Sequence, residues 1–290
     1  MSTGELRRVA VIGAGNMGHQ ISLCCVLAGL ETACVDVSEE QLQKAEAFMK
    51  KYLPERVAKG RLSEESAQEA ARLLRFTADL EAGAREADFV IEAVTEKLSL
   101  KKDLFRRLDQ ICPPQTVLAT NSSFFVSSLL AGETGRPERV CNMHFFNPAL
   151  VMKCVEVVKG PHTAAGTADL AIRLAQKMGK KPVLLHKEIY GFLVNRILRR
   201  IMDEALYLLD TGVASAEDID SAVVNALGHP MGPFTLMDLT GIDLSYHVAM
   251  ERYRESGDPA QKPSPTVVEK YARGEWGRKK GRGFYTYEEK

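Results

Sequence analysis

The sequence predicts an α/β protein in which a doubly wound, mostly parallel sheet domain is followed by an all-helical C-terminal domain. Two observations support this class. Over the first 187 residues, short Val- and Ile-rich runs alternate with longer amphipathic patterns, as in parallel sheets that carry helices on both faces. After Lys187 the strand-like runs stop, and only helical patterns follow. We therefore expect two domains, over residues 1–187 and 188–290.

The expected strands are short apolar runs flanked by turn or charge signals, and they span residues 8–15, 32–37, 88–94, 116–122, 139–146, 153–158 and 182–187. Between them, apolar periodicity predicts helices over 39–60, 97–111 and 164–178. The first of these helices follows Ser38, an N-cap residue with Gln41 three positions later, which is close to a capping box. In the second domain, helical segments are expected over 191–212, 215–228, 232–253 and 264–274.

Composition narrows the class of function. The chain has 290 residues, and its 38 basic and 38 acidic side chains give a net charge of zero. This balance argues against nucleic acid as a partner, because nucleic-acid binders carry a basic excess. The six cysteines and six histidines show no metal-ligand spacing, so we expect neither a metal site nor disulfides. No apolar run approaches the roughly 18 residues of a membrane span, and the first strand begins by Arg8; we expect no membrane partner, no targeting peptide and a cytoplasmic protein.

The stretch VAVIGAGNMG carries a glycine pattern typical of dinucleotide binding. Gly13, Gly15 and Gly18 form G-x-G-x-x-G directly after an apolar strand, at the start of a helix expected to begin near Asn16. The first glycine permits a tight turn, the second lets a pyrophosphate approach the backbone, and the third lets the helix pack on the strand. The N–H groups at the start of this helix, which includes Met17, favour an anion.

Asp36 strengthens this interpretation and bears on the choice of cofactor. It ends the next strand, about 20 residues after the glycines, where a carboxylate would bind a ribose 2′-hydroxyl. A carboxylate repels a 2′-phosphate, and the residues after Asp36 supply no arginine to accept one. NAD is therefore favoured over NADP, and a tight turn without a ligand is the alternative.

The stretch NMHFFNPALVMKCVEVV, residues 142–158, holds two apolar runs joined by the turn signal Asn147-Pro148. Each run carries one titratable residue, His144 in the first and Glu156 in the second. The residue types leave two readings open. The two side chains form either a buried pair that satisfies its own hydrogen bonds or an acid–base pair in which the carboxylate fixes the imidazole tautomer. Histidine suits the second role because its ordinary pKa is about 6.5.

Blocks of sequence along almost the whole chain resemble one enzyme family. They are GAGNMG, VIEAVTEKLSLKKDLFRRLD, ATNSS, HFFNPALVMKCVEVV, GFLVNRIL, EDID, GHPMGPFTLMDLTGID and PSP…GRKKGRGFYTY. On these blocks the chain resembles the short, monofunctional 3-hydroxyacyl-CoA dehydrogenases, which include the bacterial 3-hydroxybutyryl-CoA enzymes. The resemblance implies a Rossmann-like NAD domain, an acyl-CoA substrate, and a helical domain through which two copies form a homodimer.

The resemblance also assigns roles to individual residues. It implies that His144 is the catalytic base, that Glu156 orients it, and that Asn195 lies near the substrate. A family serine that touches cofactor and substrate matches Ser123 if no gap intervenes and Ser122 otherwise, and we prefer Ser123. Further cofactor contacts are implied at Glu96, Lys101, Asn147 and Lys279.

The predicted reaction is the reversible, NAD-dependent oxidation of an (S)-3-hydroxyacyl-CoA to the 3-oxoacyl-CoA, in fatty-acid or butanoate metabolism. Lys50 and Lys59 are candidates for CoA phosphates, with a solvated helix face as the alternative. The chain departs from the family pattern at Phe124-Phe125, where Ser-Leu is usual, and at Tyr190, where proline is usual. Two other functions fit the residues: an NAD dehydrogenase of a non-CoA 3-hydroxy acid, such as a sugar acid or carnitine, and a non-catalytic NAD-binding or structural protein.

Overall fold

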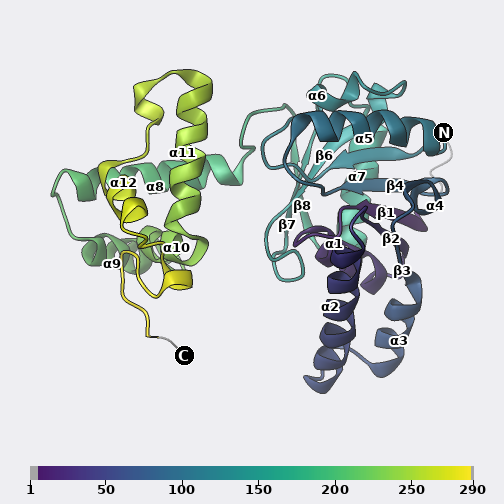
Figure 1. The fold of residues 1–290 in the computed structure, drawn as a ribbon, viewed down its shortest axis with the longest axis horizontal. Coiled ribbons are helices and arrows are strands. Elements are labelled where there is room, and N and C mark those ends of the chain that lie inside the picture. Colours follow the sequence, from purple (N-terminus) through teal and green to yellow (C-terminus); the bar gives the residue numbers. More distant parts are fainter. Residues whose placement is uncertain (1–5, 289–290) are drawn as a thin grey trace. The chain divides into compact units, whose positions relative to one another are not determined.

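The computed structural model describes residues 6–288, and the chain divides into two compact units after Leu193. Figure 1 shows a first unit in which helices surround a sheet and a second unit in which the labelled elements are helices. The predicted fold class is therefore confirmed. The predicted domain boundary lies between residues 187 and 188. In the structure the following residues still pack in the first unit, where Glu188 accepts a hydrogen bond from Ser127 and Phe192 is fully buried.

The first unit is built on an eight-stranded sheet. Its strands are β1 (Arg8–Ile12), β2 (Glu31–Val35), β3 (Leu74–Thr77), β4 (Phe89–Glu92), β5 (Val117–Thr120), β6 (Val140–Phe145), β7 (Cys154–Val158) and β8 (Lys181–Leu185). Their order across the sheet is β3-β2-β1-β4-β5-β6-β7-β8, and all neighbours are parallel except β6 and β7. The order reverses between β1 and β4, which is the switch point at which doubly wound sheets bind ligands.

Helices cover both faces of this sheet, because successive residues of a strand point to opposite faces. Val9 and Val11 of β1 pack in one core cluster with residues of α1 (Gly18–Leu27) and α7 (Ala165–Lys177). Ala10 and Ile12 of the same strand pack in another cluster with residues of α4 (Leu80–Ala84), α5 (Leu98–Ile111) and α6 (Ser128–Ala131). This alternation gives the three-layer arrangement seen in Figure 1.

Local signals predict most of these elements to within a few residues. Helix α2 (Glu39–Ala58) begins after Ser38, whose side chain accepts the N–H of Gln41 at 3.3 Å, as the capping pattern predicts. Helix α1 begins at Gly18 rather than near Asn16, because the glycine turn continues for two more residues. The edge strand β3 and helix α3 (Glu64–Leu73) were not predicted. Strand β3 is only four residues long and contains Arg75, so it lacks the apolar run of the inner strands.

The second unit consists of α8 (Val194–Asp210), α9 (Ala216–Leu227), α10 (Pro233–Thr240), α11 (Ile242–Ser256) and α12 (Pro265–Ala272), with short 3-10 turns between and after them. The helix predicted from residue 191 begins three residues later, because Gly191 and Phe192 have positive φ angles of 74° and 49°. The segment 232–253 is split into α10 and α11 at Gly241, whose φ is 104°. Within residues 6–288, none of the helices has the length and apolar character needed to cross a bilayer.

Candidate active site

The predicted site residues of the first unit gather at the carboxyl ends of the central strands. The glycine turn follows β1, Asp36 follows β2, and the Ser122–Ser123 segment follows β5. His144 lies near the end of β6, and Asn147 follows that strand. Because the carboxyl ends of parallel strands meet at one edge of the sheet, segments more than 100 residues apart in the sequence contribute to one region.

In the glycine turn, the packing of the protein requires two of the three glycines. A Cβ on Gly18 would lie 1.6 Å from the carbonyl oxygen of Gly13, and Gly13 has a φ of +106°. Gly15 differs, since a Cβ there would meet no protein atom within 4 Å. Its backbone therefore faces open space beside the start of α1, where free N–H groups favour an anion. The turn allows the close backbone approach that a pyrophosphate needs.

The Asp36 carboxylate ties the end of β2 to the glycine turn. Its two oxygens accept the backbone N–H groups of Ala14 at 2.7 Å and Ser38 at 2.9 Å. In the first turn of α1, burial lowers the pKa of His19, whose Nδ1 lies 2.8 Å from the carbonyl oxygen of Gly15. His19 is therefore neutral at pH 7 and adds no charge to the turn. The carboxylate remains the charged group hydrogen-bonded to the turn, on the side where a ribose is expected.

His144 and Glu156 lie directly opposite each other in the antiparallel pair β6–β7. His144 Nδ1 is 2.8 Å from Glu156 Oε2, and the two side chains are 5% and 0% exposed. A buried carboxylate accepts hydrogen bonds, so Nδ1 carries the proton and Nε2 presents its lone pair. The second carboxylate oxygen, Oε1, accepts the N–H of Leu193 at 3.0 Å. The tautomer and direction of the imidazole are thus fixed, as an acid–base pair requires.

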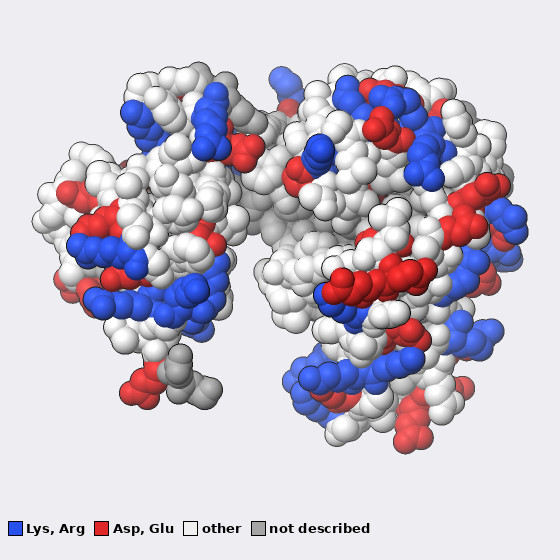
Figure 2. Space-filling model, viewed as in Figure 1, with Lys and Arg blue, Asp and Glu red and all other residues white. Residues whose placement is uncertain are grey.

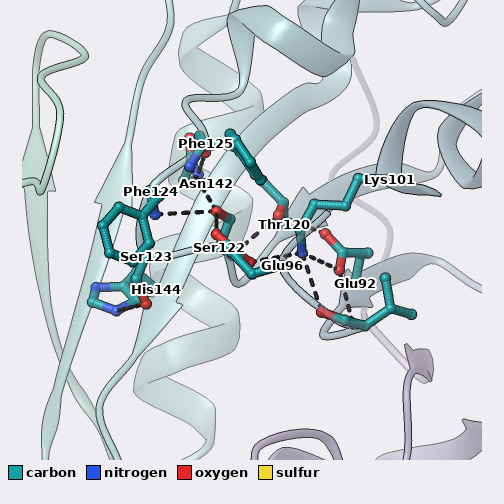
Figure 3. Close-up of polar contacts among 11 residues, drawn as sticks. Glu92, Glu96, Lys101, Thr120, Ser122, Ser123, Phe124, Phe125, Asn142 and His144 are labelled. Carbon is teal, nitrogen blue, oxygen red and sulfur yellow. Dashed lines mark hydrogen bonds and ion pairs between the residues drawn. The ribbon is translucent and has the colours of Figure 1, made fainter. Parts of the chain in front are cut away.

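The two serines after β5 have different surroundings, and Figure 3 shows both. Ser123 Oγ lies 3.2 Å from His144 Nε2, the ring nitrogen on the side opposite the carboxylate contact. Ser122 Oγ instead accepts the backbone N–H groups two and three residues further on, at 3.1 and 2.7 Å, and donates to Glu96. Ser122 therefore shapes the loop while Ser123 faces the imidazole, which favours Ser123 as the functional serine.

A buried ion pair lies next to this loop. Lys101 Nζ is 2.6 Å from Glu92 Oε1 and 3.1 Å from Glu96 Oε2, and Glu92 Oε2 accepts the hydroxyl of Thr120 at 2.6 Å (Figure 3). Lys101 is 1% exposed, whereas Glu96 is 36% exposed and has access to a ligand. Sequence reasoning missed Glu92, although a glutamate inside the apolar run DFVIEAV is the signal that marks it. The network links Lys101 to Ser122 through Glu96 and to the end of β5 through Thr120.

Asn147 is linked to the glycine turn. Its side-chain Oδ1 accepts a hydrogen bond from Asn16 Nδ2 at 3.1 Å, and both residues are exposed. Next to them, Gln20 donates to the carbonyl oxygen of Asn16 at 2.9 Å and accepts the N–H of Leu150 at 3.4 Å. These bonds hold the segment after β6 against the start of α1. A cofactor contact predicted at Asn147 therefore lies beside the predicted phosphate turn.

Two predicted site residues belong to the second unit. Asn195 is half-buried in the first turn of α8, and Lys279 is exposed in the 3-10 turn η3 (Arg278–Lys280). Lys279 Nζ lies 2.6 Å from Asp243 Oδ2, at the start of α11. The substrate contact predicted for Asn195 and the cofactor contact predicted for Lys279 would therefore come from the second unit.

Lys50 and Lys59 are not brought together. Lys50 is exposed on α2 and pairs with Glu46 at 2.7 Å, and Lys59 is the exposed residue that ends this helix. Nine residues are about two and a half helical turns, so the two side chains leave α2 on opposite sides. On the face seen in Figure 2, blue side chains gather over α2 with red ones among them. One phosphate group could therefore contact only one of the two lysines.

Two departures from the family pattern, Phe124 and Tyr190, lie close together. The rings of Phe124 and Tyr190 lie 5.5 Å apart at an angle of 57°. Phe124 follows Ser123 directly, and Tyr190 comes two residues before Phe192, whose ring lies 5.4 Å from the imidazole of His144. The unusual bulk is thus concentrated in two segments that both contact the imidazole.

Comparison with known proteins gives matches along nearly the whole chain. Residues 8–189 match the family model of the 3-hydroxyacyl-CoA dehydrogenase NAD-binding domain, and residues 191–287 match the model of the C-terminal domain of the same family. A probable 3-hydroxybutyryl-CoA dehydrogenase of Bacillus subtilis is 39% identical over 287 residues, covering 99% of both chains. A 3-hydroxybutyryl-CoA dehydrogenase of Clostridioides difficile is 36% identical over 97% of this chain and 99% of its own.

Solved structures agree with these relatives. The crystal structure of the (S)-3-hydroxybutyryl-CoA dehydrogenase PaaH1 from Ralstonia eutropha is similar with a TM-score of 0.90 at 35% identity, over 98% of this chain and 100% of the other. The similarity thus extends from the glycine turn through the helical unit. The resemblance predicted from short sequence blocks is confirmed: the chain belongs to the 3-hydroxyacyl-CoA dehydrogenase family, whose members are NAD-dependent oxidoreductases.

Proposed function

We propose that this protein oxidises (S)-3-hydroxyacyl-CoA to 3-oxoacyl-CoA, reversibly, in fatty-acid or butanoate metabolism. His144 is the general base and takes the proton of the substrate's 3-hydroxyl at Nε2. NAD, when bound at the glycine turn, supplies the acceptor for the hydride that leaves C3 of the substrate. Glu156 holds the imidazole through Nδ1 and stabilises the imidazolium that forms. In the reverse direction the imidazolium returns its proton to the substrate oxygen.

The contacts on the two ring nitrogens of His144 carry this proposal. Nδ1 lies 2.8 Å from a buried carboxylate oxygen of Glu156, so the opposite nitrogen is the basic one. Nε2 lies 3.2 Å from Ser123 Oγ, a hydroxyl that can rotate toward a substrate oxygen. The arrangement supports a substrate hydroxyl beside Nε2, with Ser123 as its second contact.

The residues at the strand ends fit the NAD that the family uses. The open backbone at Gly15 supports a pyrophosphate contact, and the carboxylate of Asp36 supports a ribose contact. We propose that the cofactor contacts the turn residues Gly13, Gly15, Asn16, Met17 and Gly18 together with Asp36, Glu96, Ser123 and Asn147. Lys101 is enclosed by Glu92 and Glu96, so it acts on the cofactor through Glu96. Lys279 adds a contact from the second unit.

The acyl-CoA part of the proposal rests on the relatives, two of which carry 3-hydroxybutyryl-CoA in their names. Asn195 and Ser123 bind the oxygen atoms of the acyl group, and either Lys50 or Lys59 binds a CoA phosphate. The helical domain, predicted over 188–290, also forms a homodimer, which its exposed apolar side chains Ile197, Tyr207, Leu227 and Leu244 support. A cytoplasmic location remains a prediction from the sequence.

An absorbance assay for NADH tests the proposed function. With NAD present, the purified protein is expected to oxidise 3-hydroxybutyryl-CoA with saturation, to work far more slowly with NADP, and to leave free 3-hydroxybutyrate untouched. A series of 3-hydroxyacyl-CoA chain lengths then gives the acyl preference. Turnover of the free acid, a sugar acid or carnitine would replace the proposal with a related non-CoA dehydrogenase. Binding of NAD without turnover of any of these would replace it with a non-catalytic role.

A further inference from the structure

The segment between β8 and α8 has an unusual backbone. Gly191 has a φ of 74°, and Phe192, the next residue, has a φ of 49°. Within residues 6–288, Phe192 is the one non-glycine residue with a positive φ. A bulky side chain in this left-handed region is strained, and such strain persists only where the surrounding structure enforces it. The surroundings of the turn at Gly191-Phe192 must therefore account for this strained backbone.

The Phe192 side chain is packed against the imidazole of the site. It is 0% exposed and forms a small core cluster with Val158 and Leu185. Its ring centroid lies 5.4 Å from that of His144, with the ring planes tilted by 51°. Phe192 thus fixes the imidazole from the side of the turn. The strained backbone is compensated by burial of an aromatic ring on a functional group.

The same turn fixes the carboxylate that orients His144. The N–H of Leu193, the residue after Phe192, donates to Glu156 Oε1 at 3.0 Å, while Glu156 Oε2 lies 2.8 Å from His144 Nδ1. The contact with Glu156 is made by the backbone of Leu193, whose side chain is exposed. One backbone N–H on the first oxygen aims the second oxygen at the imidazole. A different φ at Phe192 would redirect that N–H and remove this hydrogen bond from the carboxylate.

We propose that Phe192 is a positioning residue of the dehydrogenase reaction, which sets the imidazole of His144 directly through its ring and sets Glu156 through the Leu193 N–H. The proposal rests on the proposed role of His144 as the base. It predicts that loosening the turn lowers the chemical rate more than the binding of either substrate. A turn that merely joined the two units would affect stability and leave the geometry of the pair unchanged.

Two variants separate these possibilities. Phe192→Ala removes the ring. Gly191→Ala strains the turn without substituting His144 or Glu156. Gly29→Ala is the matched control, because Gly29 has the same φ of 74°, a Cβ there meets nothing within 4 Å, and it lies at the end of α1 away from the site. Phe192→Leu, which keeps the apolar bulk, tests rescue.

The readouts are kcat, the KM values for NAD and 3-hydroxybutyryl-CoA, and the nuclear magnetic resonance signal of the His144 Nδ1 proton. We expect kcat to fall roughly 10- to 100-fold in Phe192→Ala and Gly191→Ala, with KM values within about threefold of wild type. The Nδ1 proton signal, which is shifted by its bond to Glu156, should move or broaden in both variants. Phe192→Leu should recover most of kcat, and Gly29→Ala should match wild type in every readout.

Unchanged kcat and an unchanged Nδ1 signal in Gly191→Ala would overturn the proposal, as would an equal loss of kcat in Gly29→Ala. If Phe192→Ala does not fold, Gly191→Ala and Phe192→Leu still decide. The proposed function fails separately, through absence of turnover in the wild-type protein. The Nδ1 signal remains a test of the positioning role in that case, because it requires no substrate.

Discussion

Lys101 Nζ lies 2.6 Å from Glu92 Oε1, and the two side chains are 1% and 0% exposed. Removing one partner of such a pair leaves a buried charge without compensation, which typically costs about 3–5 kcal/mol. We therefore expect Lys101→Met to lower the free energy of unfolding by roughly that amount, and Glu92→Gln to lower it by less, because Glu96 Oε2 stays 3.1 Å from the Lys101 ammonium. The loss of stability in the double variant should be clearly smaller than the sum of the losses in the two single variants. Urea unfolding curves of the four proteins measure this coupling.

The exposed pair between Lys44 and Glu40 gives a control at the same distance of 2.6 Å, with side chains 63% and 72% exposed. Lys44→Met should leave the urea unfolding curve close to that of the wild type, because solvent screens an exposed pair. Strict additivity of the Glu92 and Lys101 effects, or an equal cost at Lys44, would contradict the importance of the buried pair.

The glycine turn makes a second prediction, in which two alanine substitutions have different effects. Gly18→Ala places a Cβ 1.6 Å from the Gly13 carbonyl oxygen, so the turn must shift, and both thermal stability and NAD affinity should fall. Gly15→Ala meets no protein atom, so thermal stability without NAD should stay close to wild type while NAD affinity falls. Melting temperatures without NAD and titration calorimetry with NAD test this. Wild-type NAD affinity in Gly15→Ala would show that no pyrophosphate approaches there.

Asp36 makes a third prediction, about cofactor choice. Loss of a hydrogen bond to a charged group costs about 1.5–3 kcal/mol, so Asp36→Ala should raise the KM for NAD roughly 10-fold or more. It also removes the charge that repels a 2′-phosphate, so the preference for NAD over NADP should narrow. Steady-state kinetics with both cofactors measure the ratio. A ratio equal to that of the wild type would mean that Asp36 serves only to hold Ala14 and Ser38.

The buried cysteines give a fourth prediction, about pH. Burial raises the pKa of the Cys141 thiol from 9.0 to about 12, and that of Cys34 and of Cys112 to about 11. Between pH 9 and the raised pKa values of about 11–12, these thiols hold their protons in the native protein and lose them in the unfolded chain. The corresponding stability is fully present below pH 9 and is lost as the pH rises toward 11–12. Melting temperatures should therefore decline over this range.

Alkylation near pH 8 gives an independent check of the thiols. Cys34, Cys112 and Cys141 should resist iodoacetamide in the native protein and react fully in urea, as read by mass spectrometry. The half-buried Cys154 should react first among the six. Equal rates in the native and unfolded protein at Cys141 would be incompatible with its burial.

Much of this fold follows from local sequence signals. The Val-rich runs, the glycine turn and the Ser38 cap each reflect a physical requirement that a few neighbouring residues satisfy. Strand β3 lacks such a signal, because its position depends on pairing with β2 and not on its own composition. The start of α8 was predicted too early for a similar reason, since the left-handed backbone at Phe192 depends on its buried surroundings.

The candidate site likewise contains residues that carry a sequence signal and contacts that carry none. His144 and Glu156 stand out in the sequence because each is a lone titratable residue in an apolar run, but their register in β6–β7 requires the antiparallel pairing. Glu92 carries the same signal, and its partner Lys101 lies on the following helix, nine residues away. The contact between Phe192 and His144 has no such signal, because an apolar residue at a helix start looks like any other core residue.

The central claim is that His144 moves the proton of the reaction and Glu156 orients it. The direct test is kcat for 3-hydroxybutyryl-CoA oxidation in His144→Gln, measured together with the Kd for NAD. Loss of a general base typically lowers the rate roughly 100- to 10,000-fold. We therefore expect kcat to fall by at least about 100-fold, while the Kd for NAD stays within about threefold of wild type. A His144→Gln protein that binds NAD normally and keeps a kcat within tenfold of the wild-type value would contradict the claim.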